Sequence, residues 1–188
     1  MPMLRVRTVF TGVTGSPWLN TLNFGSPTQT GSQMEADAAV VATGAFWGAV
    51  DALMGTQVAW STLPDVLFLG DDGVASQAYA TTPQSGVGAT VSTLLPISTQ
   101  AVVRLLTGLF IGGRQLRGRI FVPGLTEAAN GGGVPEAATL STITTAANTL
   151  NAATAPPLGV WSRVNATVEP VSAVSVWSQW GVLRSRRD

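Results

Sequence analysis

The residues best suited by type and spacing to do chemistry are arginines in the second half of the chain. Three follow a glycine pair in Gly112-Gly-Arg114-Gln-Leu-Arg117-Gly-Arg119, and three more lie in the ending Arg184-Ser-Arg186-Arg187-Asp188. Guanidinium groups can grip phosphates, which gives affinity for nucleic acid that does not depend on base sequence. Alternatively, Arg117 and Arg119 share one face of a strand and pair with carboxylates of this chain or a neighbouring subunit. Pairing is favoured, because arms that package nucleic acid are longer and more basic.

The residue types that are missing exclude most catalytic chemistry. The 188 residues include no histidine, cysteine or lysine. Disulfides and Cys/His zinc sites are therefore excluded, as are Ser–His and Cys–His nucleophiles and lysine Schiff bases. A Walker P-loop lacks its lysine. Carboxylates, hydroxyls and the single tyrosine, Tyr79, remain. We expect no enzyme, no catalytic residue, no metal ligand and no cofactor.

The carboxylates have simpler interpretations than catalysis. Asp71-Asp72-Gly73 offers oxygens to calcium but lacks the alternating spacing of an EF-hand loop, so it predicts a turn. Ser32-Gln-Met-Glu35 matches a capping box, in which Ser32 and Glu35 each cap a backbone N–H. Glu136 suits the first turn of a second helix.

The charge of the chain is sparse and unevenly distributed. Only 11% of residues are charged, against about 25% in an average soluble domain. Residues 1–103 hold two arginines and six carboxylates, whereas residues 104–188 hold eight arginines and four carboxylates. Few charges, no lysine and six tryptophans are typical of a surface covered by other subunits. A high-GC genome explains the lysine deficit equally well, but explains the scarcity of all charge less well.

Hydrophobic periodicity predicts the elements of the first half. Residues 3–10 alternate as a strand with Arg5 and Arg7 on its wetter face. Further strands are expected at 18–24, 56–63, 65–69 and 74–81, with a break at Pro64. A helix should run from the capping box to about Met54, with Trp47 on its buried face.

The second half predicts more strands and one helix. Strands are expected at 99–106, 118–122, 158–164 and 171–177, and a last short one at 181–184. A helix beginning near Pro135 has one apolar face and ends by Pro156-Pro157. That face consists of Leu140, Ile143, Ala147 and Leu150. No β-α-β alternation is apparent.

These elements predict a mainly β fold in a single domain spanning residues 1–188. We expect an antiparallel β-sandwich, jelly-roll-like, with two inserted helices; an α+β two-layer domain is the alternative. Flexible loops are expected near 11–31, 82–92 and 128–134, and a short basic tail at 184–188. Among the aromatics, Trp18 and Trp180 lie in weak elements near turns, which favours subunit contacts.

No segment indicates export or membrane insertion. Residues 1–10 carry Arg5 and Arg7 and lack the apolar centre of a signal peptide. No run reaches the roughly 18 apolar residues of a transmembrane helix. We therefore expect neither a signal peptide nor a membrane partner.

Two stretches resemble a known kind of protein. One is Leu95-Pro96, Arg104-Leu-Leu-Thr107-Gly108 and Gly112 through Glu127; the other is Val160-Trp161-Ser162 with the ending Leu183–Asp188. Together, over residues 95–188, they are similar to coat proteins of small icosahedral viruses with a single jelly-roll fold. Many such proteins begin with a long basic arm. This chain has only Arg5 and Arg7 there, so any packaging charge lies in the C-terminal half.

The resemblance implies a virion structural protein, a capsid subunit that assembles with copies of itself around a viral genome in the host cell. Arginine contacts with nucleic acid or with another subunit would come from a set of six: Arg114, Arg117, Arg119, Arg184, Arg186 and Arg187. The alternative is a phage tail-tube, tail-completion or head–tail connector protein. A third possibility, a carbohydrate-binding or hydrolytic β-sandwich, would need exposed tryptophan or tyrosine beside carboxylates.

Overall fold

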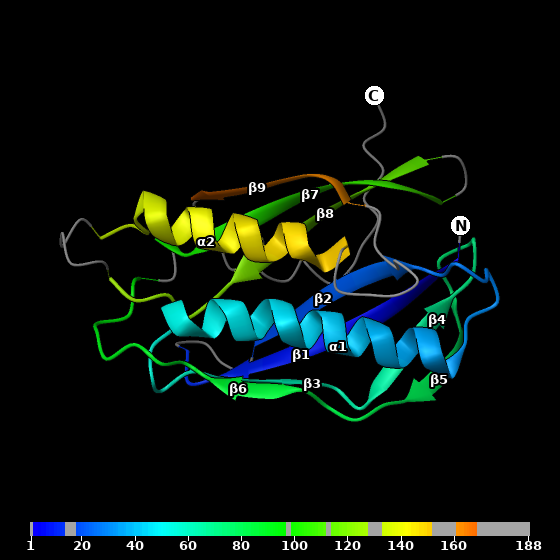
Figure 1. The fold of residues 1–188 in the computed structure, drawn as a ribbon, viewed down its shortest axis with the longest axis horizontal. Helices are drawn as coiled ribbons and strands as arrows, with labels where there is room; N and C mark the ends of the chain where they lie inside the picture. The colour runs from blue at the N-terminus through cyan, green and yellow to red at the C-terminus, as the bar shows by residue number, and fades with distance from the viewer. Residues whose placement is uncertain are drawn as a thin grey trace.

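The structure is a computed structural model that describes residues 2–13, 18–96, 99–111, 114–127, 133–151 and 161–168. These residues form two antiparallel sheets, and two helices lie side by side in front of them in Figure 1. The first sheet contains β1 (Met3–Thr11), β2 (Trp18–Gly25), β3 (Ala59–Thr62), β4 (Asp65–Leu69), β5 (Ala75–Ala80) and β6 (Ser85–Val87). The second contains β7 (Ala101–Ile111), β8 (Arg114–Val122) and β9 (Trp161–Val168). The helices are α1 (Gln33–Val50), continued by the 3₁₀ turn η1 (Asp51–Leu53), and α2 (Ala137–Asn148), continued by η3 (Thr149–Asn151).

The mainly β, antiparallel fold with two helices is confirmed. The jelly-roll connectivity and the single-domain boundaries stay predictions.

β1 is the central strand of the first sheet. Along one edge it pairs with β2 from Met3 to Phe10. Along the other edge it pairs with β3 at one end and with β4 at the other. β3 and β4 are therefore two halves of one strand, and β5 and β6 line its outer edge in the same way. The sheet is in effect four strands wide.

The break in the middle of these strands follows from Pro64, as its position in the sequence predicts. Proline has no N–H to give to a ladder. The backbone N–H of Leu63 still donates to the Arg7 carbonyl at 2.8 Å, after which the register shifts. Across the break, Thr81 N–H donates to the Pro64 carbonyl at 2.7 Å and Thr62 N–H to the Gln84 carbonyl at 2.8 Å. The sheet thus bends without losing its edge strand.

No β-α-β alternation runs along the chain, as the sequence predicts, but α1 forms one split unit that the strand pattern did not indicate. β2 and β3 both run antiparallel to β1 and therefore parallel to each other, with β1 between them. α1 connects them, which makes β2–α1–β3 a split β-α-β unit. The pattern was missed because the intervening strand precedes the unit in the chain.

Alternation along β1 buries one face of the first sheet against α1. Leu4, Val6, Thr8 and Phe10 are all at most 1% exposed. Trp47 of α1 lies among them, with its ring 4.6 Å from that of Phe10 in an edge-to-face arrangement. Its indole Nε1–H donates to Thr8 Oγ1 at 3.1 Å. The predicted core position of Trp47 is confirmed.

The start of α1 confirms half of the predicted capping box. The Glu35 N–H donates to Ser32 Oγ at 3.2 Å. The Glu35 carboxylate, however, accepts from Ser26 Oγ–H at 2.8 Å and from Thr28 N–H at 2.9 Å. The side chain is 1% exposed. It therefore fixes the loop that leads from β2 into the helix, instead of capping Ser32.

The second sheet packs on α2 and on the end of β2. β7 pairs with β8 on one edge and with β9 on the other. Ile143, Ala147 and Leu150 on the predicted face of α2 are buried, and Leu140 is partly buried. The ring of Trp18 in β2 stacks on Phe121 of β8 at 4.9 Å, which connects the two sheets.

Several boundaries differ from those expected. β7 and β8 are longer than the expected strands, because they pair with each other from Ala101 and Val122 to Ile111 and Arg114. β6 is a three-residue strand within the polar segment predicted as a loop. α2 begins at Ala137 with Glu136 as its N-cap, two residues after Pro135. β9 covers 161–168 where 158–164 was expected. The strands expected at 171–177 and 181–184, and the loop around 128–132, lie outside the described residues.

The turn at Asp71-Asp72-Gly73 is confirmed. Gly73 has φ +77°, and its N–H donates to the Gly70 carbonyl at 3.0 Å. Asp72 Oδ1 accepts from the Val74 N–H at 2.9 Å.

By length and composition, residues 33–53 are apolar enough to cross a membrane. In this fold, 44% of the most apolar 18-residue window of that segment is buried inside the protein, and the core helix of a soluble protein can pass the same test of length and composition.

Glu35→Ala should lower the free energy of unfolding by about 2–3 kcal/mol, because it leaves Ser26 Oγ and Thr28 N–H without their charged acceptor. Asp37→Ala is the matched control. It removes an exposed carboxylate from the same helix and should change stability by about 0.5 kcal/mol at most. Urea unfolding followed by tryptophan fluorescence measures both, and equal losses would contradict the role given to Glu35.

Candidate interaction surfaces

The outer face of the first sheet carries the two arginines of the N-terminal half. Arg5, Arg7 and Val9 alternate with the buried residues of β1 and are half-buried on the face away from α1. In the register of the sheet, Asn23 lies opposite Arg5 and Thr21 opposite Arg7. The predicted basic, wetter face of this strand is confirmed.

Arg5 is held in place by its cross-strand neighbour. Its Nε–H donates to Asn23 Oδ1 at 3.0 Å. Burial lowers the pKa of Arg5 below its usual value, and the positive charge of Arg7 lowers it further. Both effects disfavour the charged form, and β1 itself, with two arginines and no carboxylate, carries an excess of positive charge.

Arg7 adds to that excess. Its Nε atom is buried and has no hydrogen-bond acceptor among the residues that the structure describes. A buried donor without an acceptor costs about 1–3 kcal/mol. An acceptor supplied from outside the chain would remove this cost, which makes the outer face of the first sheet a candidate binding surface.

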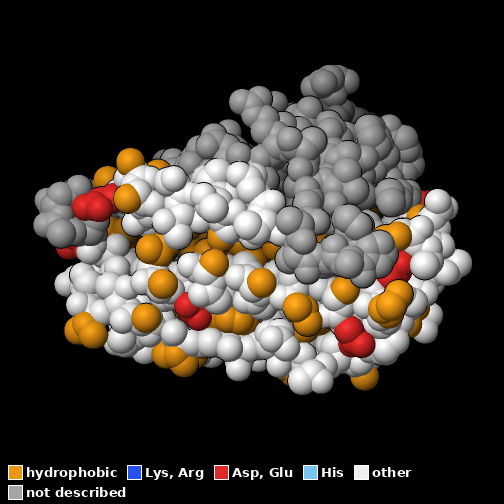
Figure 2. All heavy atoms as spheres, in the orientation of Figure 1, with side chains coloured by type: hydrophobic (Ala, Val, Ile, Leu, Met, Phe, Trp, Pro, Cys, Tyr) orange, Lys and Arg blue, Asp and Glu red, His pale blue; other side chains and the backbone are white. Residues whose placement is uncertain are grey.

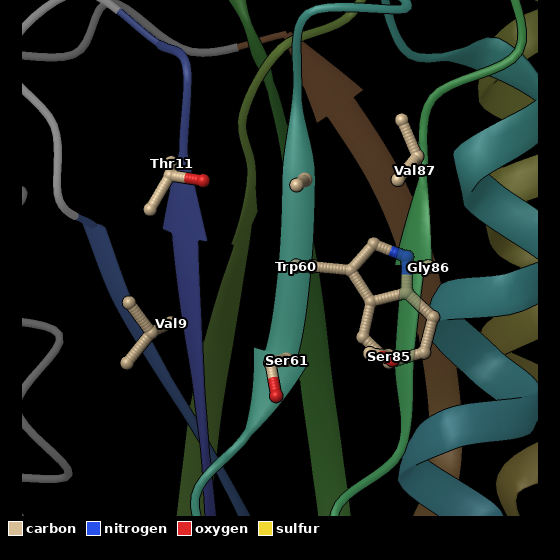
Figure 3. A pocket seen from close by; sticks show the side chains of 8 residues that line it. Val9, Thr11, Trp60, Ser61, Ser85, Gly86 and Val87 are labelled. Carbon is tan, nitrogen blue, oxygen red and sulfur yellow. The ribbon is translucent and has the colours of Figure 1, made fainter.

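A shallow pocket of about 340 Å³ lies at the other end of the same face, over β1, β3 and β6 (Figure 3). Val9 and Thr11 line one side and Ser61 the middle, with Val87 beyond. None of its lining residues is ionisable. It suits an apolar side chain from a partner and offers no acid–base chemistry.

Gly86 at this pocket is required by close packing. A Cβ there would lie 2.6 Å from Asp51 Oδ2 and 2.7 Å from Trp60 Nε1. These two atoms form a long hydrogen bond of 3.4 Å. The glycine therefore allows β6 to lie against the indole of Trp60, one of the residues that line the pocket.

The two helices present a nearly uncharged surface. Asp37 is the one charged residue among the exposed positions of α1 and α2. Figure 2 shows this face with scattered apolar groups, a few carboxylates and no arginine among the described residues. Met34 and Val41 of α1 are 64% and 54% exposed. A hollow of about 300 Å³ lies between the helices, lined by Ala49 and by small residues of α2.

The structure places three of the six predicted contact arginines. Arg114, Arg117 and Arg119 lie on β8. Positions 117 and 119 share one face, as the sequence predicts, and position 114 falls on the other face near the end of the hairpin. Arg184, Arg186 and Arg187 lie outside the described residues, as does Trp180.

The register of the second sheet brings further arginines to Arg117 and Arg119. Position 104 on β7 is directly opposite position 119 on β8. Position 106 is opposite both 117 on β8 and 163 on β9. Arg104 and Arg163 were not among the predicted contacts, because which strands pair cannot be read from the strand pattern.

Trp18, the other aromatic predicted at a subunit contact, is 8% exposed within a single chain because it stacks on Phe121. Its role in an interface stays a prediction.

Among the described residues, no group of three or more carboxylates is arranged to hold a metal ion. No family model, curated protein or solved structure matches the chain.

Arg7→Met should leave the free energy of unfolding unchanged or raise it by about 1 kcal/mol, because it removes the unpaired buried Nε–H and keeps the apolar stem. Arg5→Met is the control. It breaks the bond to Asn23 and should lower stability by about 1 kcal/mol. Urea denaturation of both variants tests this, and a larger loss in Arg7→Met than in Arg5→Met would show that Arg7 is satisfied within the chain.

Proposed function

We propose that this protein is a structural component of a virion, a capsid subunit that assembles with copies of itself. The observation that carries the proposal is that the solvent-exposed positions of α1 and α2 include one charged residue, Asp37. A helix that faces water in a monomer is normally charged or polar along its outer side. A face without these charges is suited to burial against another subunit.

Exposed apolar side chains elsewhere support the same proposal. Val91 is 90% exposed in the loop after β6, and Val87 at the rim of the outer pocket is 59% exposed. Single exposed valines are ordinary. Val87, Val91 and the helix face together expose several apolar groups. The chain has few charged residues whose repulsion would keep its copies from associating.

The finer parts of the proposal are the jelly-roll connectivity and the place of assembly. Greek-key connections between the strands of two sheets define a jelly roll, and an experimental structure of the assembled protein tests for them. Assembly would take place in the host cell, around a genome.

The alternative, a tail-tube, tail-completion or head–tail connector protein, would use the same surfaces to form rings or tubes. Electron microscopy separates the two, because closed shells support the capsid subunit and rings or tubes support the alternative.

Wild-type protein should form large particles in size-exclusion chromatography, whereas Val41→Glu should elute as a folded monomer. The substitution adds a charge at the centre of the exposed α1 face, where it would be buried without a partner in an interface. Ser76→Glu, at an exposed position of β5, adds the same charge outside the helix face and should still assemble. Wild-type protein that stays monomeric at high concentration in several salts would rule out the proposal.

A further inference from the structure

The second sheet concentrates arginine on one of its two faces. Positions directly opposite each other in a ladder share a face, as do positions two apart along a strand. The register pairs 104 with 119 and with 165, and 106 with 117 and with 163. Four arginines therefore occupy neighbouring positions on one face: Arg104, Arg117, Arg119 and Arg163. We call these positions the arginine face.

The opposite face of the same rows belongs to the core. Val103 on β7 and Ile120 on β8 are paired with each other and are at most 1% exposed. They alternate with Arg104 and Arg119 along their strands. A shift of register by one residue would exchange the two faces of the sheet. The burial of Val103 and Ile120 therefore fixes the side on which the arginine positions lie.

The strands that form the arginine face carry positive charges and no negative ones. β7, β8 and β9 contain no aspartate or glutamate. Like charges directly opposite each other in a ladder are destabilising, and Arg104 and Arg119 are such a pair. Positions of this kind lie about 5 Å apart across the strands and about 7 Å apart along them. Four arginine positions at this spacing are complementary to an anion with closely spaced charges.

The described surface of a second copy offers no such anion. Among the described residues, no three of its carboxylates form a group that could hold a metal ion, and the adjacent exposed pair Asp71-Asp72 has half as many charges as the four arginines. Several are already engaged: Glu35 with Ser26, Asp51 with Trp60 and Asp72 with the Val74 N–H. Charge complementarity therefore favours a polyphosphate backbone over another subunit.

We propose that the arginine face binds the phosphate backbone of nucleic acid. Asn165 and Gln115 occupy positions on the same face, and amide side chains of this kind commonly contact phosphate and sugar. Because these contacts are made to the backbone, binding is independent of base sequence and depends strongly on salt. This inference rests on the proposed function and deepens it, because it assigns the contact with the genome to the sheet of β7, β8 and β9 instead of to the basic ends of the chain.

The test is the salt dependence of binding to fluorescein-labelled oligodeoxythymidylate and oligouridylate, measured by fluorescence anisotropy with the full chain. Each phosphate contact to a single strand contributes about −0.7 to the slope of log K against log salt concentration. Replacing all four arginines by glutamine should therefore reduce that slope by about 3. Arg114→Gln removes one charge from the opposite face of β8 and should leave the slope unchanged, whereas each arginine of the arginine face should account for about 0.7.

Two further variants keep the test decisive if the fourfold glutamine variant does not fold. Arg104→Gln with Arg119→Gln, and Arg117→Gln with Arg163→Gln, should each remove about half of the effect. Circular dichroism and thermal melting check that every variant is folded. Wild-type protein that binds neither oligonucleotide at low salt, or variants with an unchanged slope, would overturn the inference.

The failure of this inference can be told apart from the failure of the proposed function. Particles whose nucleic-acid content, read from the 260/280 nm absorbance ratio, is unchanged in the fourfold variant would overturn the arginine face and leave the capsid proposal standing. A monomer that binds oligonucleotide with the predicted slope would overturn the capsid proposal and leave the arginine face standing. Variants that lose assembly while the wild type binds no oligonucleotide would assign the arginine face to a subunit contact instead.

Discussion

The hydrogen bond between Trp47 and Thr8 is the interaction on which the rest of the fold depends. Both side chains are at most 1% exposed, so an indole N–H or a hydroxyl left unpaired there would cost about 1–3 kcal/mol. The bond fixes which side of α1 faces β1 and where along the strand the helix lies. β1 in turn supplies both edges of the first sheet, to β2 on one side and to β3 and β4 on the other. The bond therefore joins α1 to the strand around which the first sheet is built.

Local features of the fold could be predicted from the sequence, because their causes are local. The alternation of apolar and polar residues predicted β1, Pro64 predicted the break after β3, and Ser32 predicted the start of α1. Contacts between distant segments could not be predicted in the same way. The carboxylate of Glu35 bonds to Ser26 and Thr28 because the chain returns past the helix start, which the capping pattern does not indicate. The split β-α-β unit was missed for a similar reason, since it depends on which edge of β1 the later strand joins.

The candidate surfaces also contain one part that could be predicted from local sequence and another that depends on contacts between distant segments. Strand alternation alone correctly grouped Arg5 with Arg7 and Arg117 with Arg119. Arg104 and Arg163 join the second group only through the pairing of β7 with β8 and β9, and their sequence separation gives no sign of it. The pairing follows from burial: rows such as Val103 with Ile120 must face the core, and the rows between them then carry the arginines to the other side. The hydrophobic residues of this sheet thus decide where its charge is displayed.

The scarcity of charge and its clustering can be understood together. A chain with few charged residues could avoid repulsion between them by spacing them apart. This chain instead places Arg104 opposite Arg119, and Arg5 two residues from Arg7 on one strand face. Like charges at neighbouring positions oppose each other, and a bound anion offsets that opposition. The uncharged helix face has the opposite property, since nothing opposes its burial against a similar surface. On our proposal, the uncharged helix face holds copies of the chain together. A polyanion bound to the arginine face offsets the repulsion between its arginines, and its binding therefore stabilises the folded chain.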